Sequence, residues 1–203
     1  MSLRFPVFVA AAALAIPAVS SAFAQTPRTW PSPSTAPQSG RGGSTFSLDT
    51  LFGALKIAPD EASAKAIEDR IWAIWMSCGS DTCNLLMSRV KDATDDKDYG
   101  LAIKLLDAIV TTKPDYVEAW NRRATLHYLK HEYGRALADI REVLAREPRH
   151  FGALAGLGLI LQDIGDDKHA LEAYQAALAI DPHLRDLNDT VKTLREKVEG
   201  RDI

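Results

Sequence analysis

The sequence predicts an all-α fold built from repeated pairs of antiparallel helices. The first observation is a period of 34 residues between Val117 and Leu184, in which residue types recur one unit later. The second is that apolar residues within each unit lie three or four positions apart, which is the spacing of one helix face. The third is a proline that closes each unit, Pro148 and then Pro182, because proline cannot continue a helix. Neighbouring pairs must therefore stack to bury a shared core.

The two units, 117–150 and 151–184, carry the same pattern of large and small residues. Small residues, for example Ala136 and Gly158, let paired helices approach closely, and Gly165 suits a turn between helices. The pattern positions of the first unit are Trp120, Ala124, Ala136, Leu137, Ile140, Val143, Leu144 and Pro148. Those of the second unit are Leu154, Leu157, Gly158, Leu161, Ala170, Leu171, Tyr174, Ala177, Leu178 and Pro182.

At these residues the chain resembles the tetratricopeptide repeat (TPR) family. The match is fuller in 151–184 than in 117–150, where Arg123 and His127 stand at positions that the family fills with leucine and an aromatic residue. The resemblance implies a right-handed superhelix of antiparallel helix pairs, a TPR-like solenoid, whose concave face binds peptides or protein segments. We expect the stem of Arg123 to pack and its charged head to reach a carboxylate, either Asp139 or Glu142.

Residues 45–116 are predicted to form N-terminal helices that include a degenerate repeat. One period before the first unit, the second-helix pattern recurs at Ala102, Leu106, Ile109, Val110 and Pro114. Earlier helices are predicted over 47–57, with Ser47 as N-cap, and from residue 60 or 61 to 77. Trp72 and Trp75 in the latter are expected to fill the core beside the first repeat.

Residues 185–203 are predicted to form a C-terminal capping helix. A narrow apolar stripe runs along one side of this segment and polar residues cover the rest, as the last helix of a solenoid requires. The alternative is a coiled-coil seam between two copies of the chain.

The first 24 residues are predicted to be a secretory signal. Arg4 precedes an apolar run, and Ala22-Phe23-Ala24 is a small-x-small cleavage site, so cleavage is expected after Ala24. We therefore expect a bacterial periplasmic protein with no stable membrane insertion after cleavage. The alternatives are a retained membrane anchor and a eukaryotic secretory route. Residues 25–44, rich in Pro, Gly and Ser, are predicted to be a disordered linker. Trp30 within them is either a solvated residue or a short docking motif.

Cys78 and Cys83, the two cysteines of the chain, are a disulfide candidate at a turn between helices. A disulfide suits an exported protein, and two free buried thiols are the alternative. The four-residue gap differs from the two-residue gap of redox-active pairs.

Composition and motifs point away from several classes of function. A net charge of −3 over 203 residues does not indicate nucleic-acid binding. His127 and His131 share a helix face, but no third ligand follows at a suitable spacing, so we expect no metal site and no cofactor. We also find no catalytic set of nucleophile, base and acid.

The candidate binding surface is the face of the first helices that the TPR resemblance makes concave. The residues expected there with a role in partner binding are Asn121, Arg122, Thr125, Tyr128, Leu159 and Gln162. Amide and guanidinium groups give directed hydrogen bonds to a peptide, and the tyrosine and leucine offer apolar contact. This face is alternatively a solvated surface, or is covered by the chain's own N-terminal helix.

The predicted function is a non-catalytic protein–protein interaction module, an adaptor or scaffold of the bacterial cell envelope. Its partner would be a protein or peptide segment on the concave face. The alternative is a structural scaffold that self-associates without a peptide ligand. An enzyme or metal-dependent protein is the third and weakest hypothesis, because fold class alone does not determine function.

Overall fold

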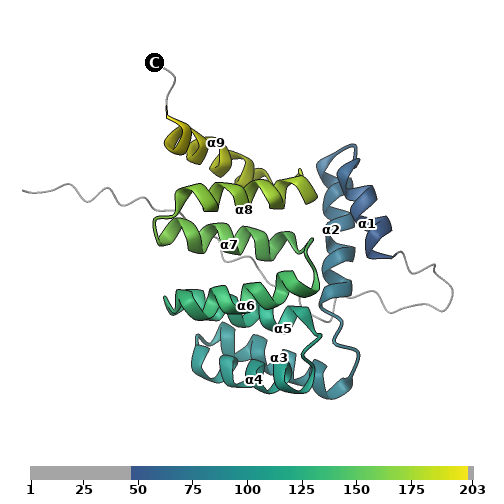
Figure 1. Cartoon of the computed structure of the whole chain (residues 1–203). Coiled ribbons are helices and arrows are strands. Elements are labelled where there is room, and N and C mark those ends of the chain that lie inside the picture. Colours follow the sequence, from purple (N-terminus) through teal and green to yellow (C-terminus); the bar gives the residue numbers. More distant parts are fainter. Residues whose placement is uncertain (1–46, 201–203) are drawn as a thin grey trace, which may run out of the picture. The chain divides into compact units, whose positions relative to one another are not determined.

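The computed structural model describes residues 47–200, so the signal and linker predicted for 1–44 lie outside the described residues. In this part of the chain there are nine α-helices and no strand (Figure 1). In order, they are α1 Leu48–Lys56, α2 Glu61–Trp75, α3 Asp81–Asp95, α4 Tyr99–Thr112, α5 Val117–Leu129, α6 Tyr133–Arg146, α7 Phe151–Asp163, α8 Asp167–Ile180 and α9 Arg185–Glu199. The all-α prediction is confirmed.

Helices α1, α2, α3, α4 and α8 begin where the side chain of a serine or aspartate accepts a hydrogen bond from one of the first backbone N–H groups. The Ser47 hydroxyl accepts a hydrogen bond from the backbone N–H of Thr50 at 3.3 Å, which confirms Ser47 as the N-cap of α1. The carboxylate of Asp60 does the same for the N–H of Ser63 at 2.7 Å at the start of α2. Helix starts in this chain can therefore be read from individual residues as well as from the repeat.

The turn inside each helix pair has the same backbone conformation in all three pairs. Lys97, His131 and Gly165, each 34 residues from the next, have φ values of +60°, +59° and +87°. This left-handed conformation is favourable for glycine and costly for other residues. The period thus extends to backbone geometry, and it includes α3–α4, the degenerate repeat.

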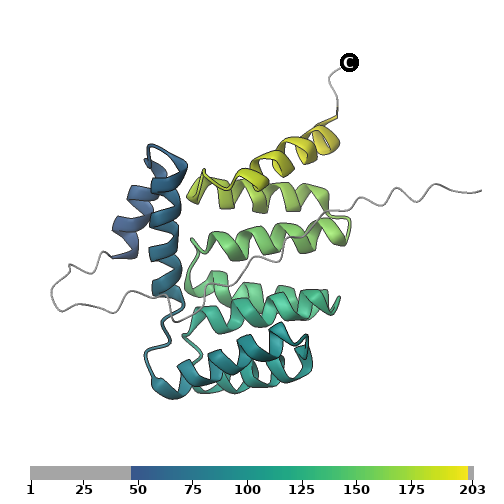
Figure 2. The same ribbon diagram turned by 180° about the vertical axis from the view of Figure 1, so that it is seen from behind.

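Three helix pairs, α3–α4, α5–α6 and α7–α8, lie one above the next, and α9 follows as an unpaired helix (Figures 1 and 2). Gly158 shows how closely α7 and α8 approach, since a Cβ atom built at this residue would lie 2.4 Å from the ring of Tyr174. The close helix contact predicted at Gly158 is therefore present.

The hairpin of α1 and α2 does not stack as a further repeat. Instead α2 stands across the ends of the repeat helices, with α1 on its outer side (Figures 1 and 2). The hairpin and the residues that follow it contact the segments between successive helix pairs. The Tyr116 hydroxyl donates to the carbonyl of Met76 at 3.0 Å, Lys113 Nζ donates to the carbonyl of Cys78 at 2.9 Å, and Arg185 pairs with Glu61.

This placement corrects the environment predicted for the two tryptophans of α2. Trp75 is buried as expected, but its neighbours are Phe52 of α1 and the two residues at the junction of the repeats, His150 and Phe151. Trp72 also packs edge-on against Phe151, with ring centroids 5.7 Å apart. The physical reason is that α2 runs along the inter-repeat turns rather than parallel to α3.

The apolar stripe of α9 is used inside the chain. Val191 and Leu194 are 7% and 2% exposed and pack in one cluster with Leu171 and Tyr174 of α8. The stripe is therefore not free to form the coiled-coil seam considered as an alternative.

An open groove of about 610 Å³ lies between α8 and α9. Lys192 lines it, two periods after Ala124 and one after Gly158. The small residue of the two earlier units is therefore replaced in α9 by a long charged one.

A disulfide joins Cys78 and Cys83 at the corner between α2 and α3, with Cα atoms 6.0 Å apart. Among residues 47–200, no helix has both the length and the apolar character needed to cross a membrane.

Candidate functional site

The candidate site is the surface formed by the first helices of the repeats, which we call the first-helix face. It consists of the residues at the second, fifth, sixth, ninth, twelfth and thirteenth positions of each unit, counted from Val117 and Phe151. In α5 these are Glu118, Asn121, Arg122, Thr125, Tyr128 and Leu129, and in α7 they are Gly152, Ala155, Gly156, Leu159, Gln162 and Asp163. Because α5 and α7 touch, the two rows form one surface.

Two of the predicted binding residues are engaged by a buried carboxylate of their own helix. Glu118 is fully buried, and its carboxylate accepts hydrogen bonds from Asn121 Nδ2 at 3.0 Å and from Arg122 Nε at 3.1 Å. Arg122 is only 8% exposed. The guanidinium predicted to bind a ligand carboxylate therefore serves an internal ion pair, because Glu118 lies one helical turn before it.

His150 adds a third polar group to this buried cluster. Its Nε2 atom lies 3.7 Å from Glu118 Oε2, and its Nδ1 atom accepts a hydrogen bond from the N–H of Ala153 at 3.0 Å. Burial alone would raise the pKa of Glu118, but His150, Arg122 and Asn121 together outweigh burial and lower this pKa. The cluster thus holds an ionised carboxylate beneath α2.

The N-terminal hairpin covers one end of the first-helix face. A Cβ atom built at Gly152 would lie 2.9 Å from Cη2 of Trp72, so the indole rests directly on the backbone of α7. The equivalent position in α5 is Glu118, buried as described. The alternative that the chain's own N-terminal helices cover the face therefore applies at Gly152.

The rest of the face remains accessible in α5 and α7. Thr125 and Gln162 are exposed, and Leu129 and Leu159 are 39% and 37% exposed. Ala155 lies between them in the register and is half-buried. The accessible part of the face combines two leucines with small residues and neutral hydrogen-bonding groups.

Tyr128 marks the far edge of the face. Burial, together with a hydrogen bond to Asp163, raises the pKa of this phenol well above its usual value. Tyr133 also donates to Asp163 Oδ2, at 3.4 Å. Gln162 Oε1 accepts a hydrogen bond from the Tyr174 hydroxyl at 3.1 Å. Contacts with neighbouring side chains therefore hold Tyr128 and Gln162 in place, and both residues still border the open surface.

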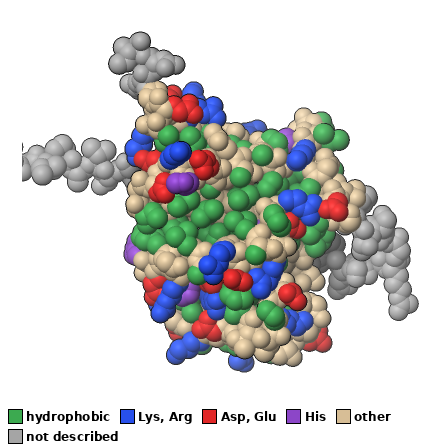
Figure 3. Space-filling view, in the orientation of Figure 1, with side chains coloured by type: hydrophobic (Ala, Val, Ile, Leu, Met, Phe, Trp, Pro, Cys, Tyr) green, Lys and Arg blue, Asp and Glu red, His purple; other side chains and the backbone are tan. Residues whose placement is uncertain are grey.

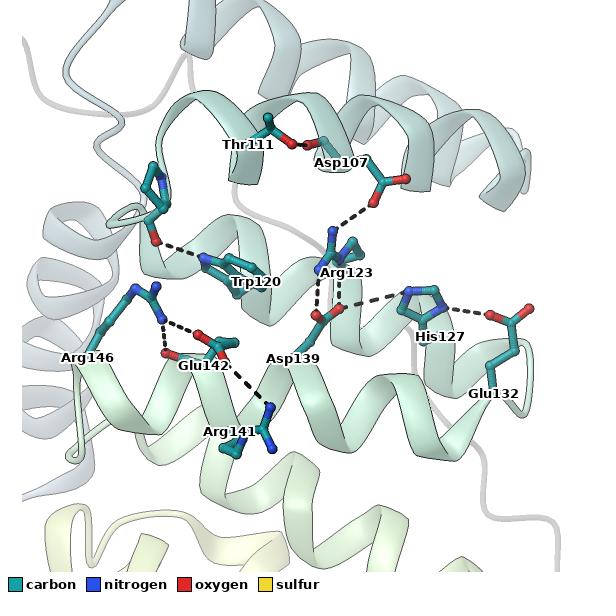
Figure 4. A network of polar contacts seen from close by, with 11 residues as sticks. Asp107, Thr111, Trp120, Arg123, His127, Glu132, Asp139, Arg141, Glu142 and Arg146 are labelled. Carbon is teal, nitrogen blue, oxygen red and sulfur yellow. Dashed lines mark hydrogen bonds and ion pairs between the residues drawn. The ribbon is translucent and has the colours of Figure 1, made fainter.

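Arg123, which stands at a position that the TPR family fills with leucine, has a structural role. Its guanidinium binds Asp139 through Nε at 2.8 Å and Nη2 at 2.7 Å, and Asp107 through Nη1 at 2.7 Å (Figure 4). The prediction that it reaches Asp139 is confirmed. His127 stands beside the pair, with Nε2 3.9 Å from Asp139 and Nδ1 2.7 Å from Glu132. These contacts tie α4, α5 and α6 together.

No metal site is evident in residues 47–200, where no three His, Cys, Asp or Glu side chains are grouped to hold an ion. His131, considered as a partner for His127, is the left-handed turn residue, and its Nδ1 atom lies 3.0 Å from the Tyr133 hydroxyl.

Sequence reasoning found the accessible leucine, threonine and glutamine but missed the buried cluster. The spacing of Glu118 and Arg122 was a usable signal, since residues four apart on a helix can pair. Nothing local to His150 indicates that an indole covers it, because that contact depends on where α2 lies.

An apolar area lies on the side of the molecule seen in Figure 1. Figure 3 shows hydrophobic side chains gathered over the middle of this side, in the region of α7, with charged side chains below them. Leu154, Leu157 and Leu161 of α7 are each half-buried. Because α7 has apolar residues on nearly all sides, it contributes hydrophobic surface in more than one direction.

Comparisons with known proteins agree with this arrangement. The family model described as "Tetratricopeptide repeat" matches residues 130–184. A TPR repeat-containing protein of Rhizobium etli is 42% identical over 153 residues, which is 75% of each chain. The small glutamine-rich tetratricopeptide repeat-containing protein 2 of Saccharomyces cerevisiae is 30% identical over 89 residues, 44% of this chain and 26% of that protein.

Solved structures share the fold. The first TPR of Spaghetti, bound to the HSP90 peptide SRMEEVD, has a TM-score of 0.57 at 14% identity, covering 62% of this chain and 99% of that one. The Sgt2 TPR domain from Aspergillus fumigatus has a TM-score of 0.53 at 24% identity, covering 61% and 86%.

Proposed function

The chain belongs to the tetratricopeptide repeat family, and we propose that it is a non-catalytic adaptor or scaffold whose first-helix face binds a peptide or protein segment. TPR domains are protein–protein interaction modules, so a protein or peptide is the expected class of partner. The observation that carries the proposal is the accessible row that Thr125, Leu129, Ala155, Leu159 and Gln162 form on α5 and α7.

The chemistry of this row suits a segment of polypeptide. Exposed leucines beside a half-buried alanine offer apolar contact area, and apolar anchors dominate binding energy in protein interfaces. Thr125 and Gln162 supply hydroxyl and amide groups that bind backbone carbonyls or N–H groups. The Spaghetti structure contains a bound peptide, which supports a peptide as the ligand class here.

We also propose that the protein works in the bacterial cell envelope, as a periplasmic protein released after cleavage behind Ala24. Support comes from the signal-like residues 1–24 and from the Cys78–Cys83 disulfide, since disulfides persist in oxidising compartments. The mass of the intact protein recovered from the periplasmic fraction tests this proposal. A species beginning at Gln25 is expected, and uncleaved protein confined to the cytosol would contradict it.

The binding proposal is tested by affinity capture from envelope extract with three proteins. They are the wild type, Leu159→Asp on the first-helix face, and Leu85→Asp as a matched control. Leu85 is 59% exposed on α3, but in the repeat register it lies one period before Ala119, at the third position of the unit and outside this face. A partner held by the wild type and the control but lost with Leu159→Asp supports the proposal. Equal capture by all three proteins would place the interface elsewhere.

Self-association is the second candidate function, favoured by the apolar area over α7 in Figure 3. Large exposed apolar patches mark interaction sites. Mass measured by light scattering over a range of protein concentrations separates the two candidates. A dimer that forms as the concentration rises and persists in Leu159→Asp would favour the scaffold.

A further inference from the structure

The 34-residue register extends the first-helix face by one period on each side, to α3 before α5 and to α9 after α7, and the charges at its positions change along the series. On α3 the face positions that carry charge are Lys91 and Asp95, and they pair with each other. On α5 they are Glu118 and Arg122, which also pair. The cations that these two helices offer at face positions are therefore already bound to carboxylates of the same helix.

The α7 and α9 end of the face is acidic. In α7, Asp163 is the one charged residue at a face position, and it is exposed. In α9, Asp186 and Asp189 occupy the positions equivalent to Gly152 and Ala155, and both are exposed. Lys197, the cation at a face position of α9, pairs with Asp167 of α8. Carboxylates thus remain at this end without a cation on the face to balance them.

We propose that the segment bound by the first-helix face is apolar and basic, with hydrophobic side chains on α5 and α7 and lysine or arginine beside the carboxylates of α7 and α9. This inference rests on the proposed function and adds the chemistry of the partner. Leu129 and Leu159 provide the apolar contacts, and the lack of charge in α7 before Asp163 leaves that part of the face neutral.

Electrostatic complementarity selects this partner against others. A basic residue near Asp189 gains attraction, whereas an acidic segment places like charges together and loses affinity. A second copy of the chain presents no matching segment from α9, because its apolar stripe is buried.

The experiment is a selection of short random peptides displayed on phage, performed with the full-length purified protein. Enriched peptides are expected to combine large apolar residues with net positive charge. Enrichment of acidic peptides, or of apolar peptides without a charge preference, would overturn the inference.

Three variants then separate the inference from the function on which it rests. For an enriched basic peptide, Asp189→Lys should weaken binding about tenfold at low salt, and this loss should shrink as salt is added. Glu172→Lys, the matched control, makes the same charge change at an exposed position of α8, away from the first-helix face, and should leave affinity unchanged. An equal loss of affinity in Asp189→Lys and Glu172→Lys would show that the effect comes from net charge alone, and this result would overturn the inference.

Leu159→Asp tests the face itself with the same peptides. If binding is lost with Leu159→Asp but unchanged with Asp189→Lys, the face binds peptides and only the inference of a basic partner fails. If binding survives Leu159→Asp, the proposed function fails as well, and the inference fails with it.

Discussion

The imidazole of His150 lies flat against the indole of Trp75, with ring centroids 4.0 Å apart and planes inclined by 10°. The histidine is fully buried, and its Nδ1 atom accepts from the N–H of Ala153. In the neutral ring the proton is therefore on Nε2, which points toward Glu118. The side chain of His150 thus caps α7, faces the buried carboxylate of Glu118 and packs against α2 where this helix crosses the repeats.

Removing the indole of Trp75 should detach α2 from the repeat helices. We expect Trp75→Ala to lower the free energy of unfolding by about 3–5 kcal/mol, because a large buried aromatic is lost and its cavity remains. Ile74→Ala is the matched control, since Ile74 is the preceding residue of α2 and is 40% exposed. Urea denaturation followed by circular dichroism measures both, and similar losses in the two variants would contradict the role given to the stack.

The buried pair of Glu118 and Arg122 should make the free energy of unfolding depend on pH in the acid range. The folded-state pKa of Glu118 is lowered, so its contribution is fully present above the unfolded value of about 4.3 and is lost as pH falls below it. Glu118→Gln should cost about 3 kcal/mol near neutral pH, because Arg122 stays buried without its carboxylate. The deficit should shrink as pH falls below this unfolded value, because the carboxylate becomes protonated. A deficit that does not change with pH in urea titrations would rule out this account.

The helices were predictable because their determinants are local. Ser47 and Asp60 begin helices through their own side chains, and the period repeats even the left-handed turn at His131 and Gly165. Pairing between helices also followed from small residues such as Gly158, whose contact lies within one unit.

The crossing of α2 was not predictable from the same signals. Its apolar face shows that Ile71 and Trp75 are buried, but periodicity does not say which partner covers them. Arg122 is buried in an ion pair with Glu118, so its register position suggested a ligand role that its environment does not support. Burial of a face residue is thus a tertiary property, and repeat registers do not include it.

The ion pair of Arg123 and Asp139 should behave as a unit. Arg123→Leu restores the residue type of the second repeat, Leu157, but leaves Asp139 buried without its main partner, at an expected cost of about 2–4 kcal/mol. Asp139→Ala copies Ala173 of the second repeat. The double variant should therefore recover most of the loss. A double-mutant cycle of unfolding free energies measures the coupling, and simple additivity would show that the two side chains act independently.

Gly156 and Gly158 lie two residues apart in α7 and should respond oppositely to alanine. A methyl group at Gly158 would lie 2.4 Å from Tyr174 Cδ1, within the rigid contact between α7 and α8. We expect Gly158→Ala to destabilise the protein by at least about 2 kcal/mol through overpacking. At Gly156 the nearest atom is Ile140 Cδ1 at 3.7 Å, an ordinary contact, so alanine should stabilise the helix by up to about 1 kcal/mol. Thermal unfolding of both variants tests the pair, because backbone entropy changes alike at both sites and only the packing differs. If Gly158→Ala also raised the melting temperature, the close approach of α7 and α8 would not be the constraint that selects glycine there.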